Sequence, residues 1–266
     1  LGRVPEAYAK GGAGAGLGTA LAYWAVLVVI ILVMLKNKRI ASYQLWQWSP
    51  VQSSLLKAGL KLGLPIGLQV FAEVAIFAVV SLQMAKFSSQ VIAAHQSAMN
   101  FATLLYAFPV SVSMALPIVI SYEIGANRPQ AARQYAIIGR LTAILFAGLT
   151  LTFLYFNRQM VAGLYGQNPV FIRLTADFLV FALFFQLADA FTAPIQGILR
   201  GYKDTTVPFL LGLISFWSLT FPIAFLLEGT TDLGPKAYWV GLIVGIFACG
   251  ITLNIRMHIV EKRTVQ

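Results

Sequence analysis

The sequence predicts an all-α polytopic membrane protein with about seven transmembrane helices. Hydrophobic residues make up 59% of the 266 residues and charged residues only 11%, whereas soluble domains carry about 25% charged residues. Seven apolar stretches occupy most of the chain, and each is near the roughly 20 residues that a helix needs to cross a bilayer. These observations exclude an ordinary soluble domain.

The spans follow from counting about 20 apolar residues per crossing at a rise of about 1.5 Å per residue. We expect them near residues 15–35, 62–83, 92–120, 135–156, 174–199, 207–227 and 238–257. Segments rich in Gly, Pro, Asn and Asp separate them, as is typical of turns. The third span is too long for one upright helix, so it should tilt or bend, with Pro109 and Pro117 as the places for a bend.

The basic residues predict the orientation in the membrane. If the loop after the first span is cytoplasmic, thirteen of the nineteen Lys and Arg residues lie on the cytoplasmic side. The positive-inside rule then places the C-terminus in the cytoplasm. This distribution also accounts for the net charge of +10. The excess of Lys and Arg is therefore better explained by the orientation of the protein in the membrane than by nucleic-acid binding.

Two of the nine acidic residues lie deep inside predicted spans. Glu73 is near the middle of the second span, and Asp189 is similarly deep in the fifth. A charge at mid-bilayer costs at least about 2.5 kcal/mol on insertion scales, so a functional role is the default interpretation. Asp177, near the start of the fifth span, could snorkel or pair with Arg173. The remaining acids fall in loops or at span ends, where we expect solvation: Glu6, Glu123, Asp204, Glu228, Asp232 and Glu261.

Amide side chains recur at helical spacing around these acids. Gln69 precedes Glu73 by four residues, and Gln96 precedes Asn100 by four, so each pair shares one helix face. The fifth span carries a seam at three- to four-residue steps: Gln186, Asp189, Ala193, Gln196 and Arg200. Such groups either hydrogen-bond across helices, for about 0.6 to 2 kcal/mol each, or line a polar cavity.

The residue types favour ion binding over catalysis. No histidine stands mid-span to act as a base for a nucleophile, and the HExxH zinc motif is absent. We therefore expect no enzyme, no cofactor, and no metal site apart from Na⁺ held by Glu73 and Asp189. A buried carboxylate resists ionisation, so a proton, Na⁺ and an organic cation occupy it in mutually exclusive ways. An antiporter needs such exclusive occupancy.

Three segments carry a family resemblance. They are LGLPIGLQVFAEVAIFAVVSLQM with Glu73, VIAAHQSAMNFATLLYAFPVSVSMAL with Asn100, and FQLADAFTAPIQGILRGYKDTTVP with Asp189. Together they resemble the C-terminal lobe of the multidrug and toxic compound extrusion (MATE) transporters, in their NorM-like branch. Glu73 distinguishes this branch from DinF-like relatives, which generally lack that acid.

The resemblance implies a twelve-helix antiporter of two six-helix lobes, which exports cationic drugs in exchange for Na⁺ or H⁺ by alternating access. On that basis residues 1–57 are the last helix of the N-terminal lobe with a cytoplasmic linker, and residues 58–266 are the C-terminal six-helix lobe. Glu73 and Asp189 match the cation site, and the candidate cavity-lining neighbours are Gln69, Gln96, Asn100 and Gln196.

The resemblance also implies partners and a location. The partners are small cationic organic substrates, membrane lipid and the missing N-terminal lobe, without nucleic acid, and the location is the bacterial inner membrane. The chain is then a partial transporter, or a half-size protein that pairs with another chain. Two alternatives remain: a flippase of lipid-linked saccharides from the same superfamily, and a membrane enzyme or channel. A flippase favours a basic cavity, and no Lys or Arg is expected at mid-span.

Overall fold

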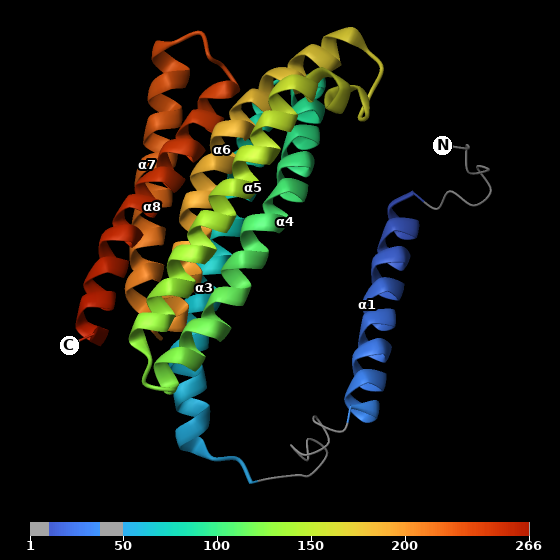
Figure 1. The fold of residues 1–266 in the computed structure, drawn as a ribbon. Coiled ribbons are helices and arrows are strands. Elements are labelled where there is room, and N and C mark those ends of the chain that lie inside the picture. The colour runs from blue at the N-terminus through green and yellow to red at the C-terminus, as the bar shows by residue number, and fades with distance from the viewer. Residues whose placement is uncertain (1–10, 38–49, 266) are drawn as a thin grey trace. The chain divides into compact units, whose positions relative to one another are not determined.

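The computed structural model describes residues 11–37 and 50–265, which form helices and short connections without strands (Figure 1). Seven helices in these ranges are long and apolar enough to cross a membrane, which confirms the predicted all-α polytopic class. Their bounds are α1 Gly11–Lys36, α3 Ser53–Gln83, α4 Ser89–Gly125, α5 Pro129–Gly163, α6 Pro169–Gly201, α7 Thr206–Thr230 and α8 Lys236–Val265. A short 3₁₀ turn, η2 (Met84–Lys86), follows α3.

Each predicted span lies inside one of these helices, and each helix is longer than the span predicted for it. The extra length is in the polar end turns, which continue the backbone hydrogen bonding after the apolar run has ended. Pro109 and Pro117 both lie inside α4, which is one helix of 37 residues. The bend expected at these prolines stays a prediction.

The chain divides into two compact units, Leu1–Leu56 and Lys57–Gln266. In the first unit the described residues form α1, whose apolar side chains from Leu17 to Leu35 are almost all exposed. A surface of this kind suits lipid or other membrane helices. The linker predicted before residue 58 lies mostly outside the described residues.

In the second unit α6 is the central helix. It packs closely against α4, α5 and α8, and α7 packs on α8. Figure 1 shows α4 and α5 on one side of α6 and α7 and α8 on the other. Helix α3 makes no comparably close backbone approach to another described helix. The side chains between α3 and the α4–α6 pair therefore have room to enclose a cavity.

Small residues allow the closest helix pairs to form. A Cβ atom on Gly197 of α6 would strike the backbone carbonyl of Ser113 on α4, and one on Gly241 of α8 would strike that of Thr220 on α7. Membrane helices commonly use small residues in this way, because burial of apolar groups provides little attraction between helices in lipid. The contact at Gly197 fixes the α4–α6 spacing next to Gln196.

We expect Gly197→Ala to destabilise the protein by about 1 to 3 kcal/mol, the usual cost of inserting atoms into a packed interface. The obstacle is the Ser113 backbone, which cannot rotate away as a side chain can. The measurement is the midpoint of thermal unfolding in detergent at a fixed scan rate. Gly148→Ala on α5 is the matched control, because nothing lies within 4 Å of its added Cβ atom. Equal midpoints for the two variants would contradict the packing described here.

Acidic residues expected to be solvated are instead mostly paired. Asp204 accepts from Arg256 at 2.6 Å, Glu228 lies 3.2 Å from Lys86, and Glu123 lies 3.7 Å from Arg128. Glu261 is buried, with His258 3.8 Å away. Solvation was therefore the wrong expectation for Asp204, Glu123 and Glu261, whose side chains are largely buried. Glu228 pairs with Lys86 at an exposed position, which is compatible with solvation. Asp232 is exposed as expected, and Glu6 lies outside the described residues.

Asp177 pairs with Lys236 at 2.7 Å, and not with Arg173 as its helical spacing suggested. The reason is tertiary, since α8 packs against α6 and brings its first residue to the early turns of α6. An ion pair within one helix is worth only about 0.2 to 0.5 kcal/mol, so a well-placed Lys on a neighbouring helix competes easily.

Candidate functional site

A cavity of about 370 Å³ lies between α3, α4 and α6. One residue each from α7 and α8, Phe216 and Ile246, completes its wall. The two mid-span acids, Glu73 and Asp189, both line it. Its apolar wall and few polar groups have the composition that is usual for small-molecule sites.

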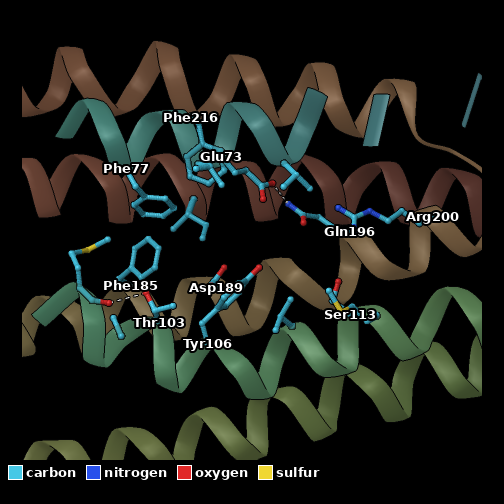
Figure 2. A pocket seen from close by; sticks show the side chains of 17 residues that line it. Glu73, Phe77, Thr103, Tyr106, Ser113, Phe185, Asp189, Gln196, Arg200 and Phe216 are labelled. Atoms are coloured by element: carbon cyan, nitrogen blue, oxygen red, sulfur yellow. Dashed lines mark hydrogen bonds between the residues drawn. The ribbon is translucent and has the colours of Figure 1, made fainter. Parts of the chain in front are cut away.

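Glu73 is held by two amide donors. Its Oε1 accepts from Gln196 Nε2 of α6 at 2.9 Å and from Gln69 Nε2, one turn earlier on α3, at 3.2 Å. Figure 2 shows the Gln196 amide reaching from α6 to the Glu73 carboxylate. Because no described helix approaches the α3 backbone as closely as α4, α5 and α8 approach α6, this hydrogen bond is an important direct link between α3 and α6.

Asp189 faces the same cavity from α6, with 8% of its surface exposed. Within residues 11–37 and 50–265 no side chain donates a hydrogen bond to it or forms an ion pair with it. The charge of Glu73 acts on Asp189, and both carboxylates act on the Tyr106 hydroxyl of α4. Two carboxylates that share a low-dielectric cavity repel each other, so the arrangement favours uptake of a cation.

The opposite end of the cavity from Gln196 is aromatic. Phe77 of α3 and Phe185 of α6 meet edge to face, with ring centroids 5.7 Å apart and planes at 80°. Figure 2 shows these two rings beyond Asp189 and Tyr106. Aromatic faces attract organic cations, and carboxylates neutralise them. The cavity therefore combines the two groups that a planar, positively charged ligand needs.

The structure does not bring all candidate cavity residues together. Gln196 lines the cavity, and Gln69 reaches it through its bond to Glu73. Gln96 and Asn100 are exposed and do not line this cavity, so a lining role for these two residues stays a prediction. Asn100 Oδ1 accepts from Tyr165 at 2.9 Å, so this side chain turns toward the connection between α5 and α6.

Arg200 lines the cavity, although no base was expected there. Helix α6 continues to Gly201, and the long Arg side chain extends back along its own helix toward Gln196 (Figure 2). Its Nε is buried without a hydrogen-bond partner. The polar seam of the fifth span already contained Arg200, four residues after Gln196. Its position near the span end suggested a loop residue, whereas the α6 seam directs it inward.

The family model described as MatE matches residues 65–226, which is more than half of the chain. The chain belongs to the MatE family. The match includes the whole of α4, α5 and α6, together with both cavity acids. It confirms the resemblance carried by the three sequence segments.

Individual MatE relatives match nearly the whole chain. A protein of Streptococcus pneumoniae (strain ATCC BAA-255 / R6) named "Probable multidrug resistance protein NorM" is 54% identical over 260 residues, which are 98% of this chain and 57% of that protein. A Bacillus subtilis (strain 168) protein of the same name is 43% identical over 264 residues, 97% of this chain and 57% of that protein. The chain thus spans a little over half the length of these relatives.

The MatE fold is also evident in three dimensions. A crystal structure of a eukaryotic MATE transporter superposes with a TM-score of 0.81 at 17% identity, over 94% of this chain and 58% of that one. At this identity the comparison shows the fold alone. The seven apolar helices and the family match make this MatE chain an integral membrane protein.

Proposed function

We propose that the chain is the C-terminal part of a multidrug exporter that expels cationic organic compounds in exchange for Na⁺ or H⁺. The observation that supports this most directly is the convergence of Glu73 and Asp189, from different helices, on one cavity with an aromatic end. Its volume of about 370 Å³ lies within the range of small-molecule sites, about 300 to 1,000 Å³. The relatives' names, which refer to multidrug resistance, support the same conclusion.

The proposal assigns the two units to different lobes. Residues 1–57 supply the last helix of the N-terminal lobe and a cytoplasmic linker, and residues 58–266 form the C-terminal lobe. The remaining helices belong to the part of the relatives that this chain does not span. Thirteen of the nineteen basic residues then lie on the cytoplasmic side together with the C-terminus, in the bacterial inner membrane.

Exchange follows from competition for the acids. When Na⁺ or a proton neutralises the carboxylates, an organic cation loses its electrostatic partners and leaves. When the organic cation occupies the cavity, the coupling ion is excluded in turn. Gln69 and Gln196 hold one oxygen of Glu73 through the cycle, which leaves the other oxygen for the ion. Rocking of the two lobes would expose the cavity alternately to each side of the membrane.

A flippase of lipid-linked saccharides is the second candidate, and Arg200 in the cavity is the observation that favours it. A pyrophosphate headgroup needs a cavity of net positive charge. Here two carboxylates face one guanidinium, so the ionised cavity is net negative. The balance of charge therefore supports the cation exporter over the flippase.

The test is transport in proteoliposomes that contain the intact transporter with these residues. We expect efflux of a cationic dye to respond to an imposed Na⁺ gradient at fixed pH or to a pH gradient at fixed Na⁺, and the responsive gradient identifies the coupling ion. Liposomes with a protonophore and a sodium ionophore serve as the control, because they hold neither gradient. Dye efflux that ignores both gradients would rule out cation-coupled exchange.

A further inference from the structure

A second cleft, of about 400 Å³, lies between the end of α5 and the start of α6, and the proposed exchange does not use it. Arg158 and Gln159 line it from α5, and Arg173 and Asp177 line it from α6. Figure 1 shows the α5–α6 and α7–α8 connections at the same end of the second unit. The first residue of α8, Lys236, therefore reaches the edge of this cleft, where it pairs with Asp177.

Both arginines of the cleft lack an acidic partner. The helical spacing predicted that Arg173 would pair with Asp177, but Lys236 holds that carboxylate at 2.7 Å. Among the residues that the structure describes, no acid forms an ion pair with Arg158 or Arg173. The Arg158 guanidinium lies over the Tyr155 ring instead, 5.7 Å from its centroid. The cleft therefore presents two guanidinium groups beside one carboxylate that is already neutralised.

The two arginines lie at the level where the apolar parts of their helices end. The apolar run of α5 ends at Phe156, two residues before Arg158, and the apolar run of α6 begins at Leu174, one residue after Arg173. This is the level of the headgroups in a bilayer. Below it, exposed apolar residues follow one face of α5 at three- and four-residue steps: Leu141, Leu145, Leu149, Phe153 and Phe156. A lipid whose phosphate enters the cleft can place its acyl chains against this face.

The basic residues of the cleft are unusual for their side of the membrane. In the proposed orientation six Lys and Arg residues lie on the face opposite the C-terminus, and three of them meet here: Arg158, Arg173 and Lys236. Basic residues are depleted from connections on that face. Their concentration at one cleft is therefore better explained by a bound anion than by topology.

We propose that this cleft binds the headgroup of an anionic phospholipid such as phosphatidylglycerol, with Arg158 and Arg173 on its phosphate. Guanidinium groups match phosphate oxygens with paired N–H donors, which suits arginine to this contact. A zwitterionic headgroup is a poorer ligand, because its ammonium would face the two arginines and Lys236. In the proposed orientation the lipid belongs to the outer leaflet. This site is separate from the cation cavity, and the inference does not rest on the exchange mechanism.

The experiment uses the purified intact transporter in phosphatidylcholine nanodiscs that contain increasing mole fractions of a photoactivatable phosphatidylglycerol. Mass spectrometry quantifies only the cross-linked peptides from residues 149–177, so lipid bound at the other membrane face is not counted. The variants are the pair Arg158→Gln with Arg173→Gln, and Asp177→Asn alone. The matched control is Lys57→Gln with Lys61→Gln, because these lysines are exposed on α3 and do not line the cleft.

We expect the wild type to reach half-maximal labelling at a lower mole fraction of this probe than of a photoactivatable phosphatidylcholine. The pair Arg158→Gln with Arg173→Gln should raise the phosphatidylglycerol midpoint by about 25-fold, or about fivefold for each basic residue lost near an anionic headgroup. The lysine control, which removes the same net charge, should stay within about twofold of wild type. Wild-type labelling of the arginine pair variant would exclude the two guanidinium groups as the site.

Asp177→Asn gives a prediction of the opposite sign. Loss of this carboxylate frees Lys236, its partner at 2.7 Å, and so adds a third unpaired positive charge at the cleft. We expect the phosphatidylglycerol midpoint to fall by about fivefold. If the ion pair only maintains the local structure, its loss raises the midpoint or leaves it unchanged, and either result overturns the inference.

Two further results decide the identity of the ligand. Equal midpoints for the two lipid probes in the wild type would show that the cleft does not select anionic lipid, as follows if the rest of the transporter supplies an acid to these arginines. Millimolar inorganic phosphate at constant ionic strength should leave the labelling unchanged, because it lacks acyl chains. Full displacement of the lipid by phosphate would assign the cleft to a free anion and overturn its assignment to lipid.

Discussion

Replacing Glu73 by Gln or Asp189 by Asn is expected to abolish cation-driven drug efflux while leaving expression and folding largely intact. In Glu73→Gln the new amide oxygen can still accept from Gln69 and Gln196, so the tie between α3 and α6 persists. Asp189→Asn removes no hydrogen bond to a described side chain. A neutral amide is easier to bury than a carboxylate, so neither variant should unfold.

Efflux fails in both variants because an amide cannot exchange a cation. We expect transport rates to drop at least about 100-fold. Neutralisation of the two carboxylates by one ligand lowers the affinity of the cavity for the other, and exchange of the coupling ion for the organic cation depends on this difference. The measurement is gradient-driven dye efflux in proteoliposomes, normalised to the amount of folded protein by size-exclusion chromatography. Asp232→Asn is the control, because this acid is exposed in the connection between α7 and α8. Wild-type efflux from both cavity variants would remove the proposed role of the two acids.

Periodicity and hydropathy predicted the helical architecture well. The apolar runs gave the position of every described span, because a helix in lipid must satisfy its backbone internally and so needs an unbroken apolar length. The ends of the helices were predicted poorly. Lengths such as the 37 residues of α4 include polar turns whose helical state depends on neighbouring helices and not on hydropathy.

Depth in the membrane predicted the acids that face the cavity, but helix spacing alone could not predict their neighbours. The spacing of Asp189 and Gln196 predicted that they share one face of α6, and both side chains line the cavity. The same reasoning did not predict the partner of Asn100, which accepts a hydrogen bond from Tyr165. A stripe on one helix says which residues point together, and only the packing of other helices says what they point at.

Arg200 was misplaced for a related reason. A basic residue near a span end is usually solvated, and the positive-inside rule counts it with the loops. Its side chain is long enough to run along the helix for more than one turn, so the location of its Cα says little about the location of its charge. The seam on α6 held the better information, because Gln196 and Arg200 are four residues apart.

Asp204→Ala is expected to cause a large loss of stability, although Asp204 lies outside the cavity. Asp204 Oδ2 accepts from Arg256 Nε at 2.6 Å, and both side chains are mostly buried, with 14% and 24% exposed. The pair ties the connection after α6 to α8. Removing one member of a buried pair leaves an uncompensated charge, which costs about 3 to 5 kcal/mol. Because the pair is partly exposed, we expect Asp204→Ala to lower the free energy of unfolding by about 3 kcal/mol, the lower end of this range.

The double variant distinguishes a lost attraction from a stranded charge. If an uncompensated Arg256 causes the damage, Asp204→Ala combined with Arg256→Ala should unfold at a higher temperature than Asp204→Ala alone. The measurement is thermal unfolding in detergent across the mutant cycle, with Asp232→Ala as an exposed acid control. A double variant less stable than either single one would mean that the two side chains stabilise the protein independently. The short ion pair would then be incidental, and the acid of the LRGYKDT segment would need another explanation.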